Sequence, residues 1–178
     1  MLMLDLFAGL GGASQAFAAR GWDVVTVDND PRFGCTHTAD LATWKWGGAR
    51  PDLIWLSPPC TEFSRESMPW CRTGKPPSLD LVLAGLRIVR ECGPTWWVLE
   101  NVRGATKYLN PLLGEPHQSH GPFFLWGEFP AFECQVKPFK ERLSGKQRAE
   151  RAKVPRALSE ALAVACERAS VFFDLSEA

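Results

Sequence analysis

Several features that would point to a class of protein are missing from this sequence. It contains no run of eighteen apolar residues, so no segment is expected to cross a membrane. Its first residues, MLMLDLFAGLGG, turn acidic too soon for a secretory signal peptide. We therefore expect the protein to remain in the cytoplasm in which it is made.

The cysteines lack the spacing of a metal site or of a disulfide framework. No C-x-x-C pair occurs among them, and the intervals between them are irregular. We expect reduced thiols and no bound metal. The six positions are Cys35, Cys60, Cys71, Cys92, Cys134 and Cys166.

An excess of charge of either sign is also absent, since 20 Lys and Arg balance 20 Asp and Glu. Overall charge therefore indicates no nucleic-acid partner. The charges are unevenly distributed, however, and between Lys137 and Arg156 eight basic residues stand against two Glu. Such a segment suits a phosphate backbone, which positions a nucleic acid without revealing its sequence. A solvated linker would have the same composition.

The sequence does contain the alternating pattern of an α/β protein. A chain of 178 residues is long enough for one domain with a hydrophobic core. Four short apolar runs each end in polar residues, which is typical of buried parallel strands. They are LMLDLF at 2–7, DVVTVD at 23–28, PDLIWLS at 51–57 and TWWVLEN at 95–101.

Helical patterns separate these runs. Residues 13–21 fit a short helix, and a longer one lies between Ser78, which can cap it, and Gly93, which can terminate it. Strands alternating with helices predict a doubly wound, mostly parallel sheet of the Rossmann-like type in a single domain. Further along, FFLWGEF is a strand candidate, and an amphipathic helix is predicted at about 155–169.

Ligands of open parallel sheets bind beyond the carboxyl ends of the strands. The glycine turn FAGLGG, which follows the first strand, lets the backbone approach a ligand closely at a helix N-terminus. Ser14 stands where the dinucleotide pattern G-x-G-x-x-G needs its last glycine, which disfavours a nicotinamide or a flavin. Asp28 is placed to accept hydrogen bonds from a ribose diol. A tight turn and a solvated strand end are the alternatives.

The stretch SPPC at 57–60 delivers a cysteine to the same edge. Pro58 and Pro59 cannot donate to a sheet ladder, so they end the strand and stiffen the loop that carries Cys60. A thiol held in such a place is useful as a nucleophile once it is partly ionised. A buried structural cysteine is the alternative.

Glu100 ends the strand WWVLEN. The apolar body of that strand would partly desolvate the carboxyl group and raise its pKa, which suits a proton donor. A glutamate at a strand end can equally cap a helix, so its pairing with Cys60 matters more than either residue alone.

Together these motifs resemble those of one family, the cytosine-C5 methyltransferases that use S-adenosylmethionine. DLFAGLGG at 5–12 is similar to the first motif of that family, SPPCTEFS at 57–64 to its Pro-Cys motif, and ENV at 100–102 to its Glu-Asn-Val motif. Their order and separations also match, over roughly residues 4–103. The resemblance implies a cofactor half at about 1–56 and a catalytic half at about 57–127, followed by the basic segment at about 130–153.

The resemblance also implies roles for single residues. Cys60 would attack C6 of cytosine and Glu100 would bond N3 and the exocyclic amine, so that C5 can take the methyl group. In a duplex the base is flipped out first. The implied cofactor-binding residues are Phe7, Ala8, Gly9, Gly11, Gly12, Asp28, Asn29, Asp40 and Pro58. The implied substrate-binding residues are Pro59, Ser64, Asn101, Val102, His120, Lys146 and Arg148.

SPPC is also similar to the Asp/Asn/Ser-Pro-Pro-aromatic motif of methyltransferases that act on adenine N6 or cytosine N4. In that motif an aromatic residue stacks on the base. Here the fourth residue is Cys60, a nucleophile that N-methylation does not need.

The resemblance is weaker towards the C-terminus. QSHGPFFLWG at 118–127 is similar to a Gln-x-Arg-x-Arg motif, but His120 and Pro122 stand where arginines are expected. His120 keeps the ability to donate to O2 of cytosine, although a histidine without a role is an alternative. RAKVPRALSEALA at 151–163 resembles the last motif, which closes over the cofactor, with Ala152 in place of an asparagine.

A target-recognition domain is missing between these last two motifs. Only about two dozen residues separate Trp126 from Arg151, too few for an independent domain. We therefore expect weak sequence specificity, a protein partner that supplies recognition, or a substrate other than duplex DNA. DNA is the predicted substrate; tRNA-type RNA, a free nucleotide and a non-catalytic cofactor-binding subunit are the alternatives. If a phage carries the gene, the cytoplasm is that of its host.

Overall fold

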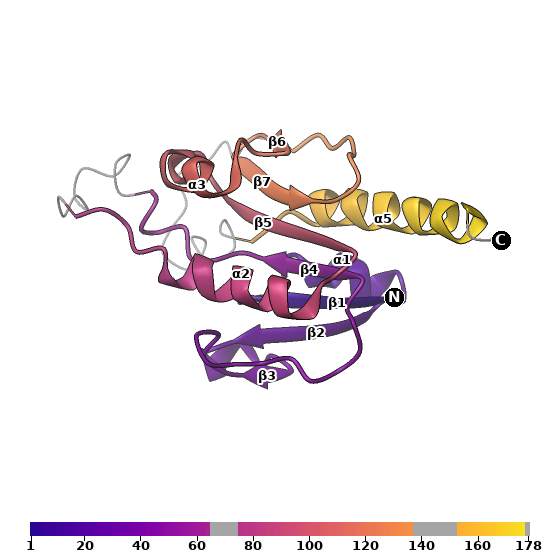
Figure 1. Ribbon diagram of the computed structural model, residues 1–178, viewed down its shortest axis with the longest axis horizontal. Helices are drawn as coiled ribbons and strands as arrows, with labels where there is room; N and C mark the ends of the chain where they lie inside the picture. Colours follow the sequence, from indigo (N-terminus) through magenta and orange to yellow (C-terminus); the bar gives the residue numbers. More distant parts are fainter. Residues whose placement is uncertain (65–74, 137–152, 177–178) are drawn as a thin grey trace.

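The sheet is doubly wound and mostly parallel, as the alternating pattern predicts. A computed structural model describes residues 1–64, 75–136 and 153–176 of the chain. Its seven strands follow the order β3-β2-β1-β4-β5-β7-β6 (Figure 1). They are β1 Leu2–Leu6, β2 Asp23–Asp28, β3 His37–Thr38, β4 Leu53–Leu56, β5 Trp96–Val102, β6 Gln118–His120 and β7 Phe123–Glu128.

Parallel pairing places the carboxyl ends of β1, β2, β4 and β5 on one edge of the sheet. β1 lies between β2 and β4, and β4 pairs with β5 so that Leu56 is opposite Leu99. The parallel strands therefore end on the same side, the left in Figure 1. β7 runs antiparallel to β5, and β6 runs antiparallel to β7. The order reverses between β1 and β4, which is where ligands of such sheets bind.

Two hydrophobic cores cover the two faces of the sheet. On one face α1 (Ser14–Ala19) and α5 (Arg156–Ser176) pack against residues such as Trp55 and Val98. On the other, α2 (Asp80–Cys92) and α3 (Thr106–Leu113) pack against alternate strand residues. Because neighbouring residues of a strand face opposite sides, β4 is buried along its whole length. This double burial explains why its sequence is an unbroken apolar run.

α2 ends at the predicted glycine and begins one residue after its N-cap, Leu79, next to the predicted cap Ser78; α5 is longer than predicted. The backbone N–H of Asp80 donates to Oγ of Ser78 at 3.1 Å, and Gly93 closes α2 in the left-handed conformation. α5 begins where it was predicted but continues to Ser176, beyond the expected end near 169. The sequence reasoning did not predict β3, β6 or α3, which are short or, in α3, contain Pro111. No helix in the described part of the chain is long and apolar enough to cross a membrane.

Candidate active site

The glycine turn between β1 and α1 has a strained backbone. Phe7 has φ 62°, while Gly9 and Gly11 have φ 51° and 71°. Positive φ is ordinary for glycine but uncommon for an aromatic residue, so the surrounding structure must hold Phe7 in place. Such turns bring backbone N–H groups close to a bound ligand.

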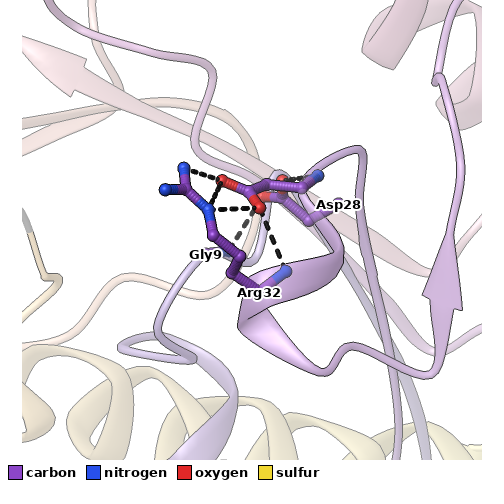
Figure 2. Close-up of polar contacts among 4 residues, drawn as sticks. Gly9, Asp28 and Arg32 are labelled. Carbon is purple, nitrogen blue, oxygen red and sulfur yellow. Dashed lines mark hydrogen bonds and ion pairs between the residues drawn. The ribbon is translucent and has the colours of Figure 1, made fainter.

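Asp28, at the end of β2, fixes this turn. Its Oδ2 accepts from the backbone N–H of Gly9 at 3.0 Å, and its Oδ1 accepts from that of Asp30 at 3.0 Å (Figure 2). Figure 2 also shows the exposed guanidinium of Arg32 held by the Asp30 carboxylate. Asp28 is half-buried, so each of its oxygens can still accept a further hydrogen bond from a ligand.

Asp5 is a buried acid in β1 whose importance the sequence reasoning missed. Asp5 is 1% exposed, and its Oδ2 has no partner among the described residues. Burial raises the pKa of Asp5 to about 7, against the lowering effect of the Ser14 hydrogen bonds. The available signal was a single acid inside an otherwise apolar strand. An orphaned carboxyl oxygen beneath the glycine turn suits a ligand with a polar group.

The loop after β4 carries Cys60 as predicted. The N–H of Ser57 still donates to Leu6 at 3.2 Å, but Pro58 and Pro59 have no N–H and the ladder stops there. The N–H and the hydroxyl of Ser64 both donate to the carbonyl oxygen of Cys60, at 3.0 and 2.9 Å, and close the loop.

The Cys60 thiol is half-buried, and its pKa is raised above the ordinary value of a thiol. Burial raises its pKa, the negative charge of Glu100 raises it further, and Ser64 acts in the opposite direction. Partial ionisation, expected from the loop position alone, is therefore not a property of the free site. Loss of the Glu100 charge removes one of the two causes that raise the pKa of Cys60, while burial remains.

Glu100 lies one residue beyond the last registered β4–β5 pair, opposite Ser57. The side chain is 9% exposed, and Oγ of Ser57 donates to its Oε2 at 3.1 Å. Burial raises the pKa of Glu100 to about 7. This confirms the direction predicted from the apolar body of its strand.

Asn101 ties the end of β5 to the loop after β4. Its Nδ2 donates to the carbonyl oxygen of Pro58 at 3.0 Å, and its Oδ1 accepts from the backbone N–H of Val102 at 2.9 Å. The side chain is 1% exposed. Pro58 is buried and Pro59 exposed, so the second proline is the one that faces outwards.

The other predicted cofactor residues lie at the same edge but are less buried. Asn29 and Asp40 are exposed, and Oδ1 of Asp40 accepts from the N–H of Ala42 at 2.9 Å. In the described part of the chain no group of three or more His, Cys, Asp or Glu side chains could hold a metal ion. The five cysteines that the structure describes are free thiols.

The glycine turn and the Cys60 loop together match a known family model. Residues 1–111 match the model of the C-5 cytosine-specific DNA methylases. The chain belongs to this family. The match covers the glycine turn, Cys60 and Glu100, and ends before β6.

The similar proteins include bacterial Type II methyltransferases. The Type II methyltransferase M.HgiGI of Herpetosiphon aurantiacus is 31% identical over 120 residues, 59% of this chain and 93% of the relative. M.AquIA of a Picosynechococcus strain is 31% identical over 129 residues, 57% of this chain and 48% of the relative. The chain therefore spans less than half of the second relative's length.

A solved structure supports the fold. A protein described as a DNA modification methyltransferase, encoded within an Escherichia coli prophage, superimposes with a TM-score of 0.50 at 22% identity. The alignment covers 72% of this chain and 46% of that one. As a C-5 cytosine-specific DNA methylase, this chain thus shares the methyltransferase fold over most of its length.

His120 lies in β6, outside the family match. Its ring stacks on Phe132 with centroids 4.7 Å apart, and its Nδ1 is 3.2 Å from the carbonyl oxygen of Cys134. If Nδ1 donates to that carbonyl, the neutral ring keeps Nε2 as an acceptor, and Nε2 is buried without a partner. Residues 118–121 and 132–136 line a cavity of about 630 Å³ around it.

The predicted closing segment contacts the glycine turn. A Cβ added to Gly12 would lie 2.8 Å from the backbone nitrogen of Val154, and Oγ of Ser159 is 3.5 Å from the Gly12 carbonyl oxygen. The start of α5 therefore packs directly on the turn. Lys146 and Arg148, with the rest of 137–152, lie outside the described residues.

Proposed function

We propose that this chain transfers a methyl group from S-adenosylmethionine to C5 of cytosine in DNA. The observation that carries the proposal is the placement of the Cys60 thiol and the Glu100 carboxyl group on adjacent strand ends, beside a strained glycine turn, within a family match. A nucleophile and a proton donor are what C5 methylation needs, because C5 becomes a good nucleophile only after a thiolate has added to C6.

The two groups assist one another electrostatically. The charge of Glu100 raises the pKa of Cys60, so protonating Glu100 removes one obstacle to forming the thiolate. The protonated carboxyl group can then donate to N3 of the pyrimidine while the sulfur adds to C6. After transfer a base removes the C5 proton and the C6–S bond breaks, which releases Cys60 as a thiolate. N3 returns its proton to Glu100, and the thiolate takes up a proton from solvent.

The residues at and around the ends of β1 and β2 fit S-adenosylmethionine, which supplies the electrophilic methyl group. Asp28 retains acceptor capacity for a ribose diol, and the orphaned Oδ2 of Asp5 suits a polar group of the methionine portion. The exposed carboxylate of Asp40 would accept from the adenine amino group. Phe7, Ala8, Gly9, Gly11, Gly12, Asn29 and Pro58 would complete the site.

The nucleic-acid side of the site would combine the loop ends with the basic segment. Pro59, Ser64, Asn101 and Val102 would surround a flipped base. His120 would donate to its O2 in the form that carries a hydrogen on Nε2, which the neutral ring lacks when Nδ1 donates to Cys134. Lys146 and Arg148 would bind phosphate. With no recognition domain between Trp126 and Arg151, we propose that a partner protein supplies target recognition or that specificity is low.

A labelled-transfer assay tests the proposal. The protein is incubated with S-adenosylmethionine carrying a labelled methyl group and with duplex DNA, single-stranded DNA, tRNA or dCTP, and modified nucleosides are identified by mass spectrometry. We expect 5-methyldeoxycytidine from DNA. 5-Methylcytidine from tRNA alone would replace DNA by RNA as the substrate, and N4-methyldeoxycytidine would overturn the chemistry.

Covalent trapping tests the nucleophile separately. A DNA oligonucleotide containing 5-fluorocytosine should form a stable adduct with the wild-type chain in the presence of the cofactor, because the fluorine cannot leave as a proton does. The adduct should map to Cys60. Its absence from a protein that binds cofactor would favour a non-catalytic subunit.

A further inference from the structure

Three side chains form a hydrogen-bonded chain that ends on the carboxyl group of Glu100. Nε1 of Trp55 lies 2.7 Å from Oγ of Ser57, and Oγ of Ser57 lies 3.1 Å from Oε2 of Glu100. Trp55 is fully buried in the core between β4, α1 and α5, and Glu100 is 9% exposed. The chain thus runs from the core to the edge where the chemistry would occur.

The hydrogens that each group carries determine which group donates in each of these hydrogen bonds. An indole N–H can only donate, so the Ser57 oxygen must be the acceptor of the Trp55 hydrogen. The single hydroxyl hydrogen of Ser57 is then available for Glu100, whose Oε2 accepts it. A hydroxyl that already accepts a hydrogen bond is a better donor, so the two bonds strengthen each other.

The two oxygens of Glu100 are therefore not equivalent. Oε2 is engaged as an acceptor, whereas Oε1 has no hydrogen-bond partner among the residues that the structure describes. In the same part of the chain the buried side-chain atoms without a partner are Oδ2 of Asp5 and Nε2 of His120. Oε1 of Glu100 is not one of them, so it keeps some contact with solvent at the edge of the sheet.

We propose that Ser57 and Trp55 are positioning residues that hold Oε2 of Glu100 as an acceptor and leave Oε1 as the oxygen that carries the proton to the pyrimidine. The assignment of that proton to a pyrimidine rests on the proposed function. The hydrogen bonds from Trp55 to Ser57 and from Ser57 to Glu100 do not depend on that function, because they are present in the free protein. A carboxyl group held by one oxygen presents the other in a single orientation, which is what proton donation to a fixed ring nitrogen requires.

Other titratable groups lie near Trp55, Ser57 and Glu100, so a test must distinguish their titration from that of Glu100. The Cα of Asp5 pairs with that of Trp55 across β1 and β4, and the pKa of Asp5 is also raised to about 7 by burial. The Cys60 thiol interacts electrostatically with Glu100. His120 lies two strands away from β5, beyond β7. Asp5→Asn and Cys60→Ser are therefore control backgrounds.

Indole nitrogen NMR of the free protein tests the chain directly. In protein labelled with ¹⁵N at the indole, the Trp55 signal is assigned by triple-resonance experiments and by its loss in Trp55→Phe. We expect this signal to shift with pH around the pKa of Glu100, about 7, in the wild type and in Asp5→Asn. The shift should disappear in Glu100→Gln and in Ser57→Ala, and persist in Ser57→Thr, which keeps a hydroxyl.

Trp126 is the internal control. Its indole N–H lies 3.2 Å from Oδ1 of Asn110 and from the carbonyl oxygen of Gly114, so it should not respond to Glu100. A Trp55 signal that titrates unchanged in Ser57→Ala, or that does not titrate in the wild type, would overturn the proposal.

Kinetics separate this proposal from the proposed function. Ser57→Ala should lower kcat about 10-fold or more with little change in the KM for DNA, and raise the apparent pKa assigned to Glu100, because the hydrogen bond that favours the carboxylate is lost. Ser57→Thr should recover most of the activity. If the protein shows the NMR response but methylates no cytosine, the proposed function alone is contradicted. If Ser57→Ala leaves the kinetics unchanged, the positioning role is contradicted.

Discussion

The side-chain amide of Asn101 holds the backbone of Pro58, so the end of β5 sets the position of the loop that presents Cys60. Asn101 and Pro58 are both buried, and Oδ1 of Asn101 accepts from the backbone N–H of Val102. A single side chain therefore couples the end of β5, which carries Glu100, to the loop that carries Cys60. The sequence alone does not indicate this contact, because an asparagine after Glu100 could equally have faced solvent.

Asn101→Ala should damage both stability and activity. The Pro58 carbonyl and the Val102 N–H would lose their partners, which costs about 1–3 kcal/mol for a buried polar group. We expect the free energy of unfolding to fall by that amount in urea titrations and kcat to fall about 10-fold or more as the Cys60 loop loosens. Asn110→Ala removes a hydrogen bond to Trp126 elsewhere and should leave kcat nearly unchanged. Equal effects of the two variants on kcat would argue against the coupling.

Cys60→Ser should abolish transfer while preserving the fold. A serine hydroxyl is a far weaker nucleophile than a thiolate, so product should fall below detection and no adduct should form with 5-fluorocytosine DNA. Cofactor affinity, measured by calorimetry, should stay within about twofold, and the unfolding midpoint should change little because Cys60 is only half-buried. Full turnover by this variant would remove Cys60 from the mechanism.

Stability should fall as the pH rises from about 4 to above 7. The pKa of Glu100 and that of Asp5 are both raised to about 7 by burial, so in this window the native state holds protons that the unfolded state has released. The free energy of unfolding then decreases with pH, by on the order of 3–4 kcal/mol for each group.

Urea unfolding at pH 5 and pH 8 measures this loss. Glu100→Gln and Asp5→Asn should each reduce the difference between the two pH values, because a neutral amide has no proton to lose. Glu128→Gln, at an exposed position of β7, should leave it unchanged. A wild-type stability that is flat between these pH values would contradict the burial argument.

Much of the fold could be predicted because its signals are local. The unbroken apolar runs and their polar ends predict the strands of the sheet interior, where burial on both faces dictates composition. β6 is only three residues long and sits on the edge, so its sequence carries little pattern. α3 contains Pro111, which the chain tolerates within a helix of eight residues but which argues against a helix in sequence.

The site was predictable in its residue types but not in its connections. The prolines and the strand ends indicated Cys60 and Glu100. The partners of Ser57, Asn101 and Asp5 depend on register between strands far apart in sequence, which single-sequence patterns do not contain. The raised pKa of Cys60 follows from the same tertiary contacts, first from burial and then from the nearby charge of Glu100.

Gly12→Ala should weaken cofactor binding. The added Cβ would lie 2.8 Å from the nitrogen of Val154 and 3.1 Å from its oxygen, so the turn and the segment before α5 must separate. We expect cofactor affinity to fall about 10-fold by calorimetry, because a small displacement of a fitted site is costly. Gly47→Ala, where an added Cβ meets nothing within 4 Å, is the matched control. Undiminished affinity would show that the turn and the segment before α5 can separate without cost to the cofactor site.

Gly104→Ala should instead damage the methyl-transfer step. Its added Cβ would lie 2.2 Å from the carbonyl oxygen of Phe63, a backbone atom of the loop that Cys60 opens. The loop must move, whereas the glycine turn is untouched, so we expect kcat to fall by about 100-fold with cofactor affinity preserved. Gly12→Ala and Gly104→Ala thus separate the two halves of the site, because each should impair one measurement and spare the other. If both variants lowered cofactor affinity equally, the two halves would behave as one rigid unit, and Phe63 and Val154 would be coupled through the sheet edge.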